Sequence, residues 1–149
     1  MRNNGERSEV KGIVLSELAR PLDILIKRLS EVINVLTECK NEREIQNVIS
    51  WKLNCSPRQY ISSEKYPSLE IDTLCKDFTI EVKFDRDFYE GLGQVLAQKF
   101  LYGIDNAFLL HIRHHVDEKY IRALKDISRR LSITTILVRL DTKEILVMK

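Results

Sequence analysis

The sequence lacks the features of membrane and secreted proteins. No stretch approaches the roughly 18 consecutive apolar residues that a membrane helix needs, and the first six residues contain no apolar run of the signal-peptide type. We therefore expect a cytoplasmic protein without a membrane partner. A large excess of one charge is missing too, because 24 Lys and Arg stand against 22 Asp and Glu, a formal net charge of +2. This balance does not decide about nucleic acid, whose binding requires local positive potential.

Cysteine is scarce as well. The chain has three cysteines, Cys39, Cys55 and Cys75, and no Cys-x-x-Cys pair. An odd number of widely spaced cysteines favours neither a disulfide framework nor a zinc site. We therefore expect three small, partly buried thiols in a reducing compartment.

What is present is the composition of one globular domain. Of 149 residues, 44% are hydrophobic and 31% are charged, which excludes disorder as a property of the whole chain. There is no internal repeat, linker or low-complexity segment. We therefore predict a single domain over 1–149.

Apolar periodicity predicts the order of helices and strands. Helices are predicted at 8–19, 21–36, 42–53, 88–102 and 117–131, and strands around 60–63 and at 69–75, 78–84, 106–112, 133–140 and 144–148. This order predicts an α/β fold, in which helices flank a central mixed sheet. Residues 1–40 form an N-terminal helical extension. The apolar stripe of helix 21–36 either pads the core or forms a homodimer interface.

The strand at 78–84 alternates strictly between apolar and polar residues. Glu81 and Lys83 therefore share one face. A two-residue turn at 76–77 keeps the apolar residues of this strand and of strand 69–75 on the same face. That register places Asp72 opposite Glu81, and Glu70 opposite Lys83.

Two opposed carboxylates lie roughly 5 Å apart at Cβ and repel each other unless a cation joins them. Mg²⁺ is a suitable cation because it takes carboxylate oxygens and keeps several waters. A lysine on the same face stabilises charge on a phosphate under attack. The alternative is a solvated polar face with a Glu70–Lys83 ion pair.

The hairpin also resembles a known signature. Ile71-Asp72, eight intervening residues and then Glu81-Val82-Lys83 resemble the D…ExK motif of PD-(D/E)XK nucleases, which include restriction endonucleases and archaeal Holliday-junction resolvases. Ile71 stands where the motif carries proline. The resemblance implies a restriction-endonuclease-like core at 41–149, which acts on branched or duplex DNA with Mg²⁺ or Mn²⁺. It further implies an endonuclease that is associated with DNA or the nucleoid and uses no small-molecule cofactor. We expect a homodimer, since a two-fold axis would present two sites to an enzyme that cuts two strands.

The same resemblance implies roles for residues of the hairpin. Asp72, Glu81 and the Val82 carbonyl would bind the metal, and Lys83 would be the catalytic lysine. A catalytically silent accessory subunit that binds nucleic acid on the same fold is the alternative.

Two helix starts extend the resemblance on either side of the hairpin. The segment 41–46 is similar to the first-helix motif of the family, so Glu42, with Glu44 as its rival, would orient the metal or a water. The segment 91–94 is similar to a glutamine-bearing helix in several branches, so Gln94 would contact substrate or support the site. In some branches a tyrosine follows one turn later, where this chain has Gln98.

Other residues are candidates to contact nucleic acid. Arg86 follows the predicted site closely, and Lys119, Arg122 and Arg129 lie on the surface of the helix at 117–131. Exposed cations of this kind contact phosphates, although on that helix they are equally consistent with a solvated face. The three histidines, at 111, 114 and 115, match no metal-ligand spacing, and we expect them on the surface or in the core.

Overall fold

The computed structural model describes residues 20–149. Within them, the helices are α2 (Pro21–Leu36), α3 (Glu42–Leu53), α4 (Leu92–Phe100) and α5 (Glu118–Arg130), and the strands are β1 (Ser56–Ile61), β2 (Leu69–Leu74), β3 (Thr79–Phe84), β4 (Ala107–Arg113), β5 (Thr135–Arg139) and β6 (Glu144–Met148). The helix predicted at 8–19 lies outside this part of the chain. None of the described helices is long and apolar enough to cross a membrane.

The strands form one mixed sheet whose order follows the chain, β1-β2-β3-β4-β5-β6. At its centre β3, β4 and β5 run parallel, and β1, β2 and β6 are antiparallel to their neighbours at the two sides. Parallel neighbours need crossover connections, which α4 and α5 supply. The predicted α/β class, with helices around a central mixed sheet, is confirmed.

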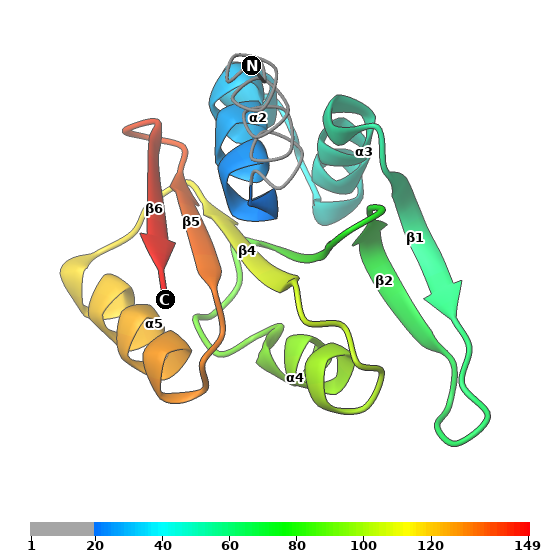
Figure 1. Cartoon of the computed structure of the whole chain (residues 1–149). Helices are drawn as coiled ribbons and strands as arrows, with labels where there is room; N and C mark the ends of the chain where they lie inside the picture. The colour runs from blue at the N-terminus through cyan, green and yellow to red at the C-terminus, as the bar shows by residue number, and fades with distance from the viewer. Residues whose placement is uncertain (1–19) are drawn as a thin grey trace, which may run out of the picture.

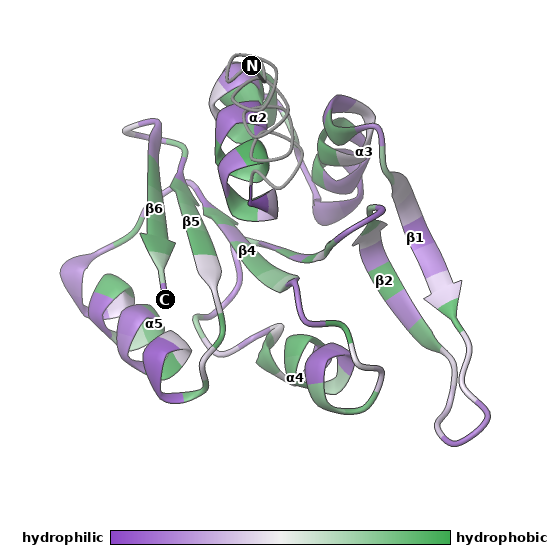
Figure 2. Cartoon of the chain, in the orientation of Figure 1, coloured by the Kyte–Doolittle hydropathy of each residue, from purple (hydrophilic) through white to green (hydrophobic). Residues whose placement is uncertain are grey.

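Helices cover both faces of the sheet, with α2 and α3 on one face and α4 and α5 on the other (Figure 1). The main core lies under α2 and α3, and Figure 2 shows hydrophobic residues along most of β4 and β5. The apolar stripe of α2 is buried in this core: Leu22, Leu25, Leu29, Val32, Ile33 and Leu36. Of the two alternatives for that stripe, the structure shows the packed core, so the buried stripe is not free to form a homodimer interface.

Two elements begin four residues away from the predicted start, and the other boundaries differ by two residues or fewer. Strand β1 begins at Ser56 and includes Pro57, which pairs with Thr73. Because β1 is an edge strand, it tolerates a proline, which lacks the N–H that a central strand would need. Helix α4 begins at Leu92 rather than at 88, because Gly91 precedes it with a φ of 88°, a left-handed conformation outside helical geometry.

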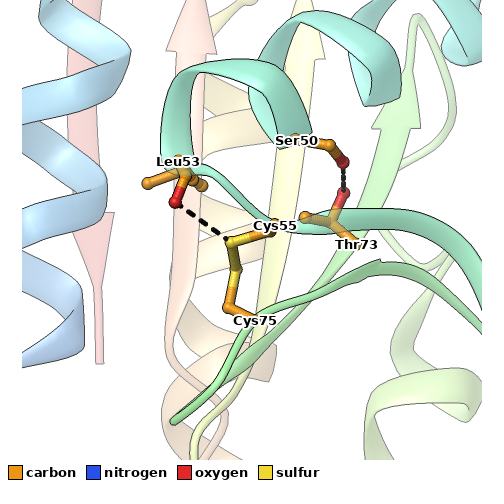
Figure 3. Close-up of a disulfide and its surroundings, with 5 residues drawn as sticks. All are labelled: Ser50, Leu53, Cys55, Thr73 and Cys75. Atoms are coloured by element: carbon orange, nitrogen blue, oxygen red, sulfur yellow. Dashed lines mark hydrogen bonds between the residues drawn. A yellow bond between two sulfur atoms is a disulfide. The ribbon is translucent and has the colours of Figure 1, made fainter.

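The prediction of three free thiols is wrong. Cys55 and Cys75 form a disulfide (Figure 3). Among the described residues, only Cys39 is a free cysteine, and it is buried. The pairing follows from the sheet. Ser56 and Leu74 are partners in the β1–β2 ladder, so the cysteines one residue beyond each of them are brought together with their Cα atoms 4.7 Å apart. An odd cysteine count could not reveal this register.

Candidate functional site

The β2–β3 hairpin has the predicted register. Thr73 pairs with Ile80, and the N–H of Cys75 donates to the carbonyl of Phe78 over 3.0 Å. The same register would next pair Asp72 with Glu81 and then Ile71 with Val82. Instead the ladder ends after Ile80, and the two strands separate toward their other ends.

Carboxylates occupy the edge of β3 that the ladder leaves open. The Val82 N–H donates to Asp72 Oδ2 over 2.8 Å, and the Phe84 N–H donates to Glu42 Oε1 over 3.1 Å. Each acid satisfies a backbone donor that β2 would otherwise have paired. An acid from β2 and an acid from α3 are thereby fixed along one edge of β3.

Asp72 and Glu81 are both removed from solvent, with exposed fractions of 9% and 3%. Burial, followed by the charge of Asp72, raises the pKa of Glu81 to about 8. Burial also raises the pKa of Asp72, although the hydrogen bond from Val82 opposes it. Among the described residues, Glu81 Oε2 is buried without a hydrogen-bond partner. When both acids are ionised, the pair therefore carries more negative charge than Lys83 compensates.

Lys83 is the nearest cation to this pair. Its Nζ lies 3.4 Å from Glu81 Oε1, and its side chain is 15% exposed. The predicted alternative, an ion pair between Lys83 and Glu70, is not formed. Gly91 packs against the aliphatic part of Lys83, since a Cβ at Gly91 would lie 3.2 Å from Lys83 Cγ and Cε. The start of α4 thus holds the lysine over Glu81.

The two candidate acids of the first helix have different surroundings. Glu42 lies against β3 and also accepts from Arg86 Nε at 3.3 Å. Glu44 belongs to the helix cap, where its N–H donates to the side chain of Asn41 and its carboxylate accepts from the N–H of Lys40. Glu42 is therefore the acid that the fold brings to the hairpin.

The predicted glutamine and the one that the structure buries are different residues. Gln94 is exposed on the first turn of α4. Gln98 is fully buried and accepts a hydrogen bond from the Thr79 hydroxyl over 2.5 Å. The structure shows no contact between Gln94 and the carboxylate pair.

Sequence reasoning missed a buried histidine beside the lysine. His111 of β4 pairs with Lys83 of β3 and is fully buried, whereas His114 and His115 contact aspartates at the surface. Its Nε2 lies 3.1 Å from the Glu90 carbonyl, and its Nδ1 lies 2.9 Å from the Tyr120 hydroxyl. Burial lowers the pKa of His111 to about 4, so the ring is neutral at pH 7. Since a carbonyl only accepts, Nε2 carries the proton.

This histidine helps to hold the loop between β3 and α4. The Tyr120 hydroxyl lies 3.0 Å from the Arg86 carbonyl, to which Arg113 also donates. Both ends of the loop that follows Lys83 are thus fastened to β4 and α5. An alternating strand pattern gives no signal for such an arrangement, because it depends on which loop covers the strand.

No family model, curated protein or solved structure matches this chain.

Of the candidates for contact with nucleic acid, Arg86 lies near the hairpin, and the three on α5 belong to a helix that packs elsewhere on the sheet. Arg86 lies beside Glu42, as its position suggested. Lys119, Arg122 and Arg129 are exposed on α5, which packs against β5 and β6, beyond β4 from the carboxylate pair (Figure 1). Within 20–149, no group of three or more His, Cys, Asp or Glu side chains could hold a metal ion. The predicted metal set differs from such a group in having two carboxylates and one backbone carbonyl.

Proposed function

We propose that this protein is a metal-dependent nuclease with a restriction-endonuclease-like core, which hydrolyses phosphodiester bonds of branched or duplex DNA. The observation that carries the proposal is the buried pair Asp72 and Glu81, with one oxygen of Glu81 unpartnered and Lys83 at 3.4 Å. Uncompensated buried carboxylates are destabilising. They are retained where they bind a ligand or take part in a reaction.

The donor set suits a hard divalent cation. Asp72 and Glu81 supply carboxylate oxygens, and the Val82 carbonyl lies on the same open edge as the Val82 N–H that Asp72 accepts from. Mg²⁺ or Mn²⁺, when bound, would polarise the phosphate and lower the pKa of water. Binding of the cation would displace the proton of Glu81, whose pKa is about 8, into the solvent.

The other residues would position the substrate and stabilise charge. The Lys83 ammonium, held between Glu81 and Gly91, would stabilise the negative charge that develops on the phosphate. Glu42 fixes the end of β3 and the side chain of Arg86. Beneath the site, His111 of β4 and Thr79 of β3 are buried, and the buried Gln98 of α4 accepts a hydrogen bond from Thr79.

The test is a cleavage assay with labelled linear, nicked and four-way-junction DNA, with and without Mg²⁺ or Mn²⁺. We expect metal-dependent cutting that Asp72→Asn abolishes. Glu70→Gln is the matched control, because Glu70 is exposed on the same strand and contacts none of the proposed site. It should cut as the parent protein does. Folded parent protein that binds DNA but cuts none of the substrates would replace the proposal with the accessory-subunit alternative.

A further inference from the structure

A hollow of about 540 Å³ opens beside the start of α3. It is lined by Lys40, Asn41, Glu42, Arg43, Phe84 and Arg86. The size is that of many ligand pockets, but those are mostly lined by apolar side chains. Phe84 is the one apolar residue in this lining, so the hollow suits a charged ligand.

The charge of the lining is positive. Three cationic side chains face one carboxylate, and that carboxylate already accepts from Arg86 and from the backbone of Phe84. Lys40 and Arg43 are exposed, and within 20–149 neither forms an ion pair. The α3 dipole, with its positive end at Glu42, adds to this potential.

The hollow lies beside the carboxylate pair, along the same strand. Glu42 and Phe84 belong both to the lining and to the open edge of β3. From Glu81 to Phe84 the strand advances roughly 10 Å. Neighbouring phosphates of one strand lie about 7 Å apart, because each rotates around the duplex as well as rising along its axis, so this distance corresponds to about one or two nucleotides.

We propose that this hollow binds a backbone phosphate of the nucleic acid, about one or two nucleotides from the phosphodiester bond that the carboxylate pair receives. The assignment rests on the proposed function for its register, but its chemistry, cations on a phosphodiester, is independent of cleavage. Lys40 and Arg43 make the contact, and Arg86, which also lines the hollow, is held there by Glu42.

The first test measures binding without turnover. Asp72→Asn protein is titrated into fluorescent DNA and RNA duplexes of one sequence, at several salt concentrations. Adding Lys40→Ala and Arg43→Ala should weaken binding about tenfold and reduce the salt slope by about one. Lys27→Ala with Lys76→Ala, which removes two other exposed cations, is the control and should change neither. Equal effects of the two pairs of substitutions on binding would overturn the proposal. Whichever duplex, DNA or RNA, the protein binds more tightly identifies the nucleic acid.

The second test locates the phosphate. Single neutral methylphosphonates are introduced on either side of the cleavage position. We expect a loss of affinity at a single position about one or two nucleotides away, and the Lys40→Ala/Arg43→Ala protein should no longer show it. Loss at every position alike would overturn the register. If Asp72→Asn still cuts while the double variant loses binding, the catalytic assignment fails and the phosphate site stands. If the double variant binds normally while Asp72→Asn no longer cuts, the phosphate site fails and the catalytic assignment stands.

Discussion

The buried carboxylate Glu81 should make the fold less stable as the pH rises. Its pKa is about 8 in the folded protein, whereas a solvent-exposed glutamate side chain, as in the unfolded chain, has a pKa of 4.5. The folded state therefore binds the proton more tightly, so the associated stability is complete below pH 4.5 and is lost as the pH rises to 8. At about 1.4 kcal/mol for each pKa unit, the loss is at most about 5 kcal/mol.

The Glu81→Gln variant tests this directly, because glutamine keeps the shape and cannot ionise. At pH 5 the parent and the variant should have similar free energies of unfolding in urea. At pH 9 the variant should be more stable than the parent, by several kcal/mol, because only the parent must ionise a buried Glu81. The proton lost from the parent belongs to the Asp72–Glu81 pair as a whole, because the two acids interact. Adding Mg²⁺ at pH 9 should restore the stability of the parent and leave the variant unchanged.

Two results would refute this reasoning. Parallel pH profiles of the parent and the variant would mean that Glu81 titrates normally and is not desolvated in solution. Lower stability of Glu81→Gln at every pH would mean that the carboxylate stabilises the fold, for instance through Lys83, rather than being retained at a cost for binding.

Two further predictions concern the lysine and the disulfide. Lys83→Met should lower the single-turnover cleavage rate by about 100-fold or more, because it removes a charge that stabilises the transition state. The affinity for Mg²⁺, measured by calorimetry, should be preserved. A loss of cleavage rate under about tenfold would exclude a catalytic lysine. Replacing Cys55 and Cys75 by serine opens a loop with a sequence separation of 20, which should lower the free energy of unfolding by about 3 kcal/mol and the Tm by roughly 10 °C. Dithiothreitol should have the same effect on the parent and none on the variant, and equal Tm values with and without reductant in the parent would contradict the bond.

The hairpin could be predicted because its information is local. The alternation in β3 fixes which residues share a face, and a one-residue slip would have moved Ile80 from the core to the site. The sequence pattern therefore placed Asp72, Glu81 and Lys83 together. It did not show that the ladder ends after Ile80, because that depends on Asp72 and Glu42 taking the hydrogen bonds of β3.

What the sequence could not show depends on contacts between distant elements. The disulfide requires the β1–β2 register, and the choice between Glu42 and Glu44 requires knowing which side of α3 faces the sheet. Both acids lie in the first turn of the helix, so spacing alone leaves them equivalent. The cations of α5 looked suitable by exposure, but their distance from the hairpin follows from the order of the strands.

That strand order has a consequence for how the chain is made. Each strand joins the sheet beside the one synthesised just before it, so no strand waits for a partner encoded far downstream. The growing sheet can extend one strand at a time as the chain leaves the ribosome. Both acids of the pair lie on strands that precede the first parallel crossover, so the amino-terminal part can bring them together before α4 arrives to hold Lys83.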